Sequence, residues 1–197
     1  MRDMEERLPQ PVHRVEDSSP APGDLELVRG FLSLHDHGRT SSASLEPSTD
    51  TLAWFLRTNG LLPDNAGIDP ADAEWVIAVR SALIARVREN MGEPVDPTVA
   101  ARLNLCAVET GLRPRFDEPR MDPTAGGVRG AVGILLGIAF MSELDGSWHR
   151  FRMCADPDCM TVFYDRSKNH SAKWCSMQSC GNRSKVRAFR ERHAPAT

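Results

Sequence analysis

The sequence lacks an uninterrupted hydrophobic run long enough to cross a membrane, and its first residues are not expected to act as a leader for secretion. Its longest mostly apolar run, Ala131–Met141, has 11 residues, whereas a spanning helix needs about 20. Residues 1–19 are charged and polar, not basic and then apolar, as a signal peptide would be. We therefore expect a cytoplasmic protein with no membrane partner.

A large excess of one charge is also missing from the chain as a whole. The 197 residues include 24 Lys or Arg and 27 Asp or Glu, and 41 % of them are apolar, as in ordinary globular proteins. The charge is nevertheless polarised. Residues 149–197 carry ten Lys or Arg against four Asp or Glu, a balance of +6, and residues 1–148 have a balance of −9. This asymmetry indicates two parts with different partners.

Common enzyme signatures are absent as well. The chain contains no G-x-S-x-G, no H-E-x-x-H and no dinucleotide-binding fingerprint. The glycines at 126–137 are not followed by the lysine of a phosphate-binding loop. We therefore expect that the protein is not an enzyme.

Four of the five cysteines gather near the C-terminus. Two C-x4-C pairs stand fifteen residues apart, and their members are Cys154, Cys159, Cys175 and Cys180. In a reducing compartment, paired cysteines indicate metal ligands before disulfides. Four thiolates fill the tetrahedral shell of zinc and leave no position open for catalysis. The sequence predicts one structural Zn²⁺, with a disulfide as the alternative. The nearby histidines, His149, His170 and His193, are expected at the surface.

A short hairpin and a helix are expected around these cysteines. β-branched and aromatic residues at 160–164 predict a strand, and the polar residues at 165–169 predict a turn. Ser176 can cap a helix from about Met177 to His193. Such a helix would carry Cys180 in its first turn, an arrangement typical of a treble-clef-like zinc finger.

The expected last helix has an apolar face and a basic face. Val186 and Phe189 are three residues apart, and we expect them to pack over the zinc site and Trp174. Five cations lie on the rest of the helix: Arg183, Lys185, Arg187, Arg190 and Arg192. Guanidinium groups bind DNA phosphates and read guanine. The helix dipole and the negative charge of a Zn(Cys)4 centre would favour the same cations, so both interpretations stay open.

Residues 148–192 resemble the CGNR zinc finger. The resemblance rests on the tetrapeptide C-G-N-R at 180–183, on W-C-S-M at 174–177 and on R-S-K-V-R at 183–187, together with the four cysteines. In that family the finger follows an N-terminal ABATE domain, which is described as a stress-induced transcription regulator. The resemblance implies a DNA-binding regulator whose four cysteines ligate zinc.

The resemblance also assigns roles to the residues that follow Cys180. Gly181 would let the backbone pass close to the metal. Asn182 and Arg183 would either hydrogen-bond to cysteine sulfurs or face nucleic acid. The candidate DNA-binding residues are Asn182, Arg183, Lys185, Arg187, Arg190 and Arg192.

Helical periodicity dominates the chain before the cysteines. Residues 1–22, rich in proline and charge, are expected to form a disordered arm. Apolar spacing and capping residues predict helices at about 24–37, 49–58, 69–91, 96–110 and 126–144. Residues 113–119 form either a short strand or an extended loop. We expect Cys106 to be a buried, inert thiol and His35-Asp36-His37 to be polar residues at a helix end instead of a second metal site.

Together these patterns predict a mainly α protein with one or two short strands and a small C-terminal zinc finger. The expected parts are the arm at 1–22, an ABATE-like helical domain at 23–147 and the finger at 148–197. The predicted function is zinc-dependent DNA binding in transcription regulation. The helical domain would sense a small-molecule or protein signal or mediate homodimerisation. The alternatives are a zinc-stabilised protein–protein interaction module and RNA binding.

Overall fold

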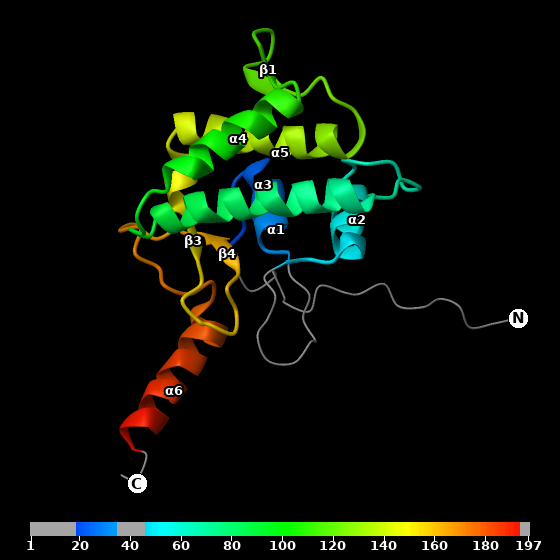
Figure 1. The fold of residues 1–197 in the computed structure, drawn as a ribbon. Coiled ribbons are helices and arrows are strands. Elements are labelled where there is room, and N and C mark those ends of the chain that lie inside the picture. The colour runs from blue at the N-terminus through cyan, green and yellow to red at the C-terminus, as the bar shows by residue number, and fades with distance from the viewer. Residues whose placement is uncertain (1–18, 35–45, 194–197) are drawn as a thin grey trace, which may run out of the picture.

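Helices make up most of the structure, a computed structural model that describes residues 19–34 and 46–193. The elements run in the order α1 (Leu25–Leu32), α2 (Thr49–Thr58), α3 (Pro70–Glu89), α4 (Pro97–Glu109), β1 (Arg113–Arg115), β2 (Arg120–Asp122), α5 (Gly127–Leu144), η2 (Ser147–Arg150), β3 (Phe151–Met153), β4 (Val162–Tyr164), η3 (Met177–Gly181) and α6 (Asn182–Arg192). Most of the expected arm, the segment His35-Asp36-His37 and residues 194–197 lie outside the described residues. The expected mainly helical fold class is confirmed (Figure 1).

Side-chain caps set the starts of three helices where the sequence places them. Ser48 Oγ accepts the backbone N–H of Thr51 at 3.3 Å, and Asp69 Oδ1 accepts that of Asp72 at 2.8 Å. Asp96 caps α4 in the same way, and proline follows it at the first helical position. A short polar side chain satisfies N–H groups that have no partner inside the helix, so these boundaries follow from local chemistry.

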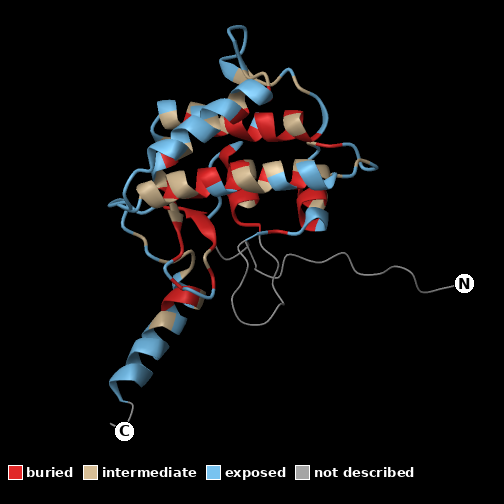
Figure 2. Cartoon of the chain, in the orientation of Figure 1, coloured by how far each residue is buried: buried red, intermediate tan, exposed pale blue. Residues whose placement is uncertain are grey.

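The main core forms where α1, α3 and α5 pack together. Val28 and Phe31 of α1, Val76 of α3, and Val132 and Leu135 of α5 are fully buried. Figure 2 shows the buried residues on the inward faces of these helices. Burial of this apolar surface is the main force that holds the helical body together.

The apolar stretch of α5 is longer than the 11-residue run Ala131–Met141. Its 18 residues, Gly127–Leu144, are long and apolar enough to span a membrane, the one such helix among the described residues. However, 56 % of this stretch is buried inside the protein. This burial is typical of the core helix of a soluble protein.

A small hairpin stands where one strand or a loop was expected. Strands β1 and β2 pair antiparallel, with Arg113 opposite Asp122 and Arg115 opposite Arg120. Strand β2 lies against α5, where a Cβ on Gly137 would stand 2.5 Å from the carbonyl oxygen of Met121. The absence of a side chain at Gly137 therefore lets β2 lie directly against α5.

The second hairpin, β3–β4, has two buried faces. Phe151 pairs with Tyr164 and Met153 with Val162, and these four side chains join the core of the helical body. The opposite face carries Phe163, which packs with the cysteines. Because successive side chains of a strand point to opposite sides, the hairpin contributes to both cores and ties the cysteine cluster to the helices. The division at residue 148 remains a prediction.

Candidate metal centre

The four clustered cysteines come from two segments that the hairpin brings together. Cys154 and Cys159 lie on the turn between β3 and β4, and Cys180 lies in the π-helical turn η3. The backbone N–H of Ala155 donates to the carbonyl of Lys173 at 2.8 Å and joins the two segments. Ser176 Oγ accepts the N–H of Ser179 and caps η3 as expected.

The sulfurs have the spacing of a tetrahedral metal site. All four Sγ atoms lie within 4.8 Å of one another. Cys175 Sγ stands 3.6 Å from that of Cys159 and 3.5 Å from that of Cys180. Zinc bonds to sulfur at about 2.3 Å, which places tetrahedral ligands about 3.8 Å apart. A disulfide needs sulfurs about 2.05 Å apart, and all five cysteines are free.

The protonation of these thiols is coupled, because they are buried and touch one another. Hydrogen bonds from the thiols of Cys154 and Cys175 lower the pKa of Cys159. Hydrogen bonds to Cys154 and Cys159, together with burial, raise the pKa of Cys175. Four thiolates therefore cannot coexist here without a cation, and a bound Zn²⁺ would replace the protons. Four sulfurs close the metal's shell, so its role is structural.

Arg183 donates hydrogen bonds to one of the sulfurs and to a buried carboxylate. Its Nη2 stands 3.0 Å from Cys180 Sγ, and its Nε donates to Asp156 Oδ2 at 2.9 Å. The hydrogen bond to Asp156 raises the pKa of Arg183, so the side chain stays charged. Of the two roles suggested for Arg183, the contact with sulfur is the one present.

Asn182 and Gly181 have partners other than the sulfurs. The Asn182 amide donates to the carbonyl of Gln178 at 2.9 Å. A Cβ on Gly181 would stand 3.0 Å from Met177 Sδ. The end of the Met177 side chain fills this space, and because that side chain is flexible and 53 % exposed it can move aside for a Cβ. The close approach of the Gly181 backbone to the metal stays a prediction.

The rotation of α6 differs from the expected one. Val186 and Phe189, expected to pack over the zinc site and Trp174, are 49 % and 55 % exposed. Arg187 Nη2 instead contacts Asp158 at 2.7 Å and lies 3.7 Å from Asp156. Asp156 and Asp158 lie on the turn between β3 and β4 that carries Cys154 and Cys159, which we call the first cysteine turn. Their carboxylates attract the arginine face of α6, and the apolar face points to solvent.

Sequence reasoning missed the acidic partners of these arginines. The signal was present in the stretch A-D-P-D-C at 155–159, which places two carboxylates beside a cysteine. Thr161 was missed as well: its Oγ1 lies 3.2 Å from Cys159 Sγ. Asp165, read as a turn residue, is buried and accepts the backbone N–H groups of Ser167 and Ala172.

Comparison with known families agrees with this geometry. Residues 150–193 match the family model of the CGNR zinc finger. No curated protein matches the chain significantly. The match and the four sulfurs at tetrahedral spacing together identify residues 150–193 as a CGNR-type zinc finger that supports one structural zinc ion.

Proposed function

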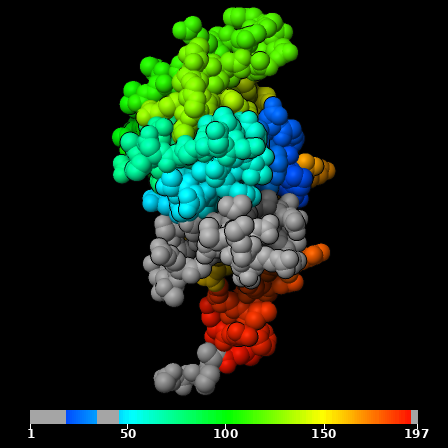
Figure 3. Space-filling model, turned by 90° about the vertical axis from the view of Figure 1, so that its right-hand side faces the viewer, coloured from blue at the N-terminus to red at the C-terminus, as the bar shows by residue number. Residues whose placement is uncertain are grey.

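We propose that the chain is a zinc-dependent DNA-binding regulator of transcription that docks α6 against the phosphate backbone. The observation that carries this proposal is the position of α6. The helix projects from the end of the body opposite the β1–β2 hairpin (Figures 1 and 3). None of its residues is buried by the described chain. A protruding helix of this kind can approach a duplex without rearrangement of the body.

The cations of α6 divide into two groups. Arg183 and Arg187 are paired with the carboxylates of the first cysteine turn. Lys185, Arg190 and Arg192 form no ion pair with the described residues. We assign the phosphate contacts to these three residues, with Arg187 and Asn182 at the margin of the surface and Arg183 as a positioning residue. Zinc contributes by fixing the base of the helix.

Salt dependence of binding tests this assignment. Each phosphate contact contributes about 0.9 to the slope of log affinity against log salt. The variant Lys185→Gln/Arg190→Gln/Arg192→Gln should bind a 30-base-pair duplex more weakly, with a slope smaller by about 2.7. Fluorescence anisotropy at several salt concentrations gives both quantities.

The matched control places the same loss of charge on the helical body, in Arg57→Gln/Arg88→Gln/Arg113→Gln, and should leave the slope unchanged. Equal slopes for the wild type and the α6 variant, with zinc content intact, would overturn the proposal. A single-stranded RNA probe in the same assay tests the alternative of RNA binding.

The proposal extends to the rest of the chain. Residues 23–147 would be an ABATE-like domain that senses a signal or mediates dimerisation, and the protein would act in the cytoplasm, where thiols stay reduced. The family match covers residues 150–193, so its support for a regulatory role of the helical domain comes only from the finger to which this domain is joined.

Self-association through α6 is a second candidate, because apolar side chains are exposed on this helix. Val186 and Phe189 are about half exposed, and Met177, in η3 before α6, is 53 % exposed. Analytical ultracentrifugation of the wild type and of Val186→Ser/Phe189→Ser tests this interpretation. A dimer that the double variant dissociates would support it, and a wild-type monomer at all concentrations would refute it.

A further inference from the structure

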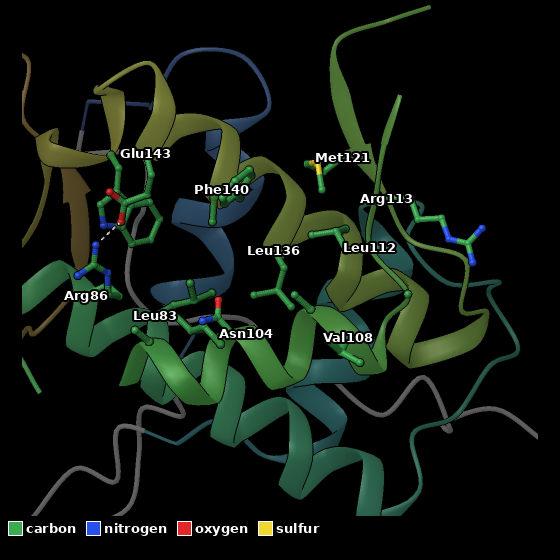
Figure 4. Close-up of a pocket in the computed structure, with 16 residues that line it drawn as sticks. Leu83, Arg86, Asn104, Val108, Leu112, Arg113, Met121, Leu136, Phe140 and Glu143 are labelled. Carbon is green, nitrogen blue, oxygen red and sulfur yellow. Dashed lines mark hydrogen bonds and ion pairs between the residues drawn. The ribbon is translucent and has the colours of Figure 1, made fainter. Parts of the chain in front are cut away.

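Two regions of the described structure expose apolar side chains together. One is a pocket between α3, α4 and α5, with walls that include Leu136 and Phe140 (Figure 4). At one end of it Arg86 and Glu143 neutralise each other in an ion pair of 2.9 Å, the dashed line in Figure 4, so this end presents no charge that would select a partner. The other region lies on α6, and there the apolar side chains stand among unpaired cations.

The apolar side chains of α6 belong to a narrow uncharged strip, which consists of Asn182, Val186 and Phe189. These residues follow one another at spacings of four and three, so the repeat of 3.6 residues per turn places them within about 60° around the helix. Val186 and Phe189 are about half exposed, and Asn182 is exposed. Two large apolar side chains side by side on a protruding helix indicate a surface that a partner covers.

Cations border the strip on both sides. Lys185 and Arg192 lie on one side of it and Arg190 on the other, each about 70–90° from its middle by helical geometry. None of these three side chains forms an ion pair with the described residues. Glu191, the one acidic residue of α6, lies on the opposite face. The strip and its borders therefore present positive charge on two sides of an uncharged centre.

Both ends of the strip are ordered by contacts within the helix. The ring of His193 stacks on that of Phe189 with 4.1 Å between the ring centroids. The Asn182 amide nitrogen donates to the carbonyl of Gln178, while its Oδ1 has no hydrogen-bond partner among the described residues. Side chains that are already ordered lose less conformational entropy when a partner binds.

The order of cation, uncharged strip and cation matches the major groove of DNA. The groove is about 12 Å wide and admits one helix, with base edges at its floor and a phosphate backbone along each wall. Base edges there offer the methyl group of thymine to apolar side chains and a donor–acceptor pair of adenine to asparagine. A second copy of α6 would instead place its own cations against these cations, and opposed like charges repel.

We propose that α6 enters the major groove with the strip toward the base edges. Val186 and Phe189 contact thymine methyl groups, and Asn182 reads an adjacent adenine. Lys185 and Arg192 bind the phosphates of one strand, and Arg190 binds those of the other. This inference rests on the proposed function and adds a sequence preference to it, since the three uncharged residues together favour sites with A·T pairs.

Selection from a duplex library tests the preference. The zinc-loaded full chain, presented with duplexes that contain about 20 randomised base pairs, should enrich sites that share a core of A·T pairs. Replacement of a contacted thymine by deoxyuridine removes only the methyl group and should weaken binding about fourfold, the effect of one buried methyl group. A library that stays random, or selected sites that bind equally well with uracil in place of every thymine, would overturn the proposal.

Substitutions in the strip should remove discrimination and spare the phosphate contacts. Val186→Ala/Phe189→Ala should lower the ratio of affinities for a selected and a shuffled duplex about tenfold or more, with an unchanged salt slope. The matched control is Leu105→Ala/Val108→Ala, because these exposed apolar residues on α4 are also three apart. The control should discriminate as the wild type does. Equal discrimination by both variants, with zinc content intact, would refute the role of the strip.

Asn182→Ala tests the contact with adenine alone. Loss of the amide that pairs with the adenine edge should relax the preference at a single position of the selected site by about fivefold or more. The rest of the site should be selected as before. A selection profile identical to that of the wild type would refute this contact.

Failure of this inference and failure of the proposed function give different results. If Lys185→Gln/Arg190→Gln/Arg192→Gln lowers the salt slope while Val186→Ala/Phe189→Ala discriminates as the wild type does, α6 binds phosphates with another rotation and only the strip is wrong. If the wild type binds no duplex, the proposed function fails as well. A wild-type dimer that Val186→Ala/Phe189→Ala dissociates, with discrimination unchanged, would mean that a second copy covers the strip and would overturn the inference.

Discussion

Arg183 on α6 and Asp156 on the first cysteine turn form an ion pair beside the metal centre, with a separation of 2.9 Å from Nε to Oδ2. The Asp156 side chain is 1 % exposed and that of Arg183 is 46 % exposed. The same guanidinium also contacts Cys180 Sγ. One side chain therefore links both cysteine segments and shares the negative charge of the sulfurs, which gives the arginine of C-G-N-R a structural role.

Replacement of Arg183 should weaken zinc binding. Loss of a residue that orients a ligand typically costs about 10- to 100-fold in metal affinity, and we expect this range for Arg183→Ala. Arg183→Lys should rescue zinc binding only in part, because an ammonium group lacks the planar fork that reaches both partners. Competition with a chromogenic chelator measures the affinity.

The control for this experiment is Arg190→Ala, on the same helix but without an ion pair to the described residues. It should bind zinc as the wild type does. If Arg183→Ala and Arg190→Ala have equal zinc affinity, the contact with Cys180 does not support the metal.

Removal of zinc should loosen the finger without unfolding the helical body. Four buried or half-buried thiols lose their shared ligand, so residues 154–159 and 172–192 should exchange amide hydrogens faster. Phe151 and Tyr164 should remain protected, because their side chains belong to the main core. Hydrogen–deuterium exchange with and without chelator measures this pattern, and equal protection of the cysteine turns in both samples would contradict a structural role for zinc.

Local chemistry explains why much of the fold could be predicted. Ser48, Asp69 and Asp96 cap helices by contacts within three residues, so the helix starts are readable from the sequence alone. The paired spacing of the cysteines likewise points to a shared ligand. The burial of Cys106 also agrees with the expectation, and burial raises the pKa of its thiol, which makes it less reactive.

The orientation of α6 could not be predicted, because it depends on a contact between distant segments. Helical periodicity gives the last helix an apolar face with Val186 and Phe189 and a basic face, but it does not say which face meets the finger. The buried carboxylate of Asp156 sets the orientation of α6, because it pairs with Arg183, which lies 27 positions further along the chain. Strand β4 lies within the strand predicted at 160–164, but its partner β3 was missed, since a strand of three residues is too short to show a pattern.

Acidification should remove a stabilising ion pair from α1. Glu26 pairs with the buried Arg29 and accepts the N–H of Ala21 at 2.7 Å. Burial opposes its charge, but these partners outweigh burial and lower its pKa from the ordinary 4.5. The native state then holds its proton more weakly than the unfolded chain does. The stabilisation is therefore complete above pH 4.5 and is lost as the pH falls through the lowered pKa.

Glu26→Gln tests this pH dependence. At pH 7 the variant should be less stable by about 1–2 kcal/mol, less than for a fully buried pair because Glu26 is partly exposed. The difference should shrink as the pH falls through the lowered pKa of Glu26, because the carboxyl of the wild type then becomes neutral as well. Urea denaturation at pH 7 and at a series of lower pH values gives the free energies. Glu74→Gln, at an exposed site on α3, should change little, and a pH-independent loss in Glu26→Gln would contradict the assignment.

The close contact between α5 and the β1–β2 hairpin should make Gly137 sensitive to a single added methyl group. Alanine is favoured over glycine inside a helix by about 1 kcal/mol. Here, however, its Cβ would lie 2.5 Å from the backbone oxygen of Met121, which cannot rotate away as a side chain would. Overpacking of this kind costs about 1–3 kcal/mol, so Gly137→Ala should be destabilising in thermal denaturation. Gly67→Ala, with no atom within 4 Å of the added group in the described structure, should be neutral or slightly stabilising. A Gly137→Ala protein as stable as the Gly67→Ala protein would mean that β2 can move away from α5 at no cost.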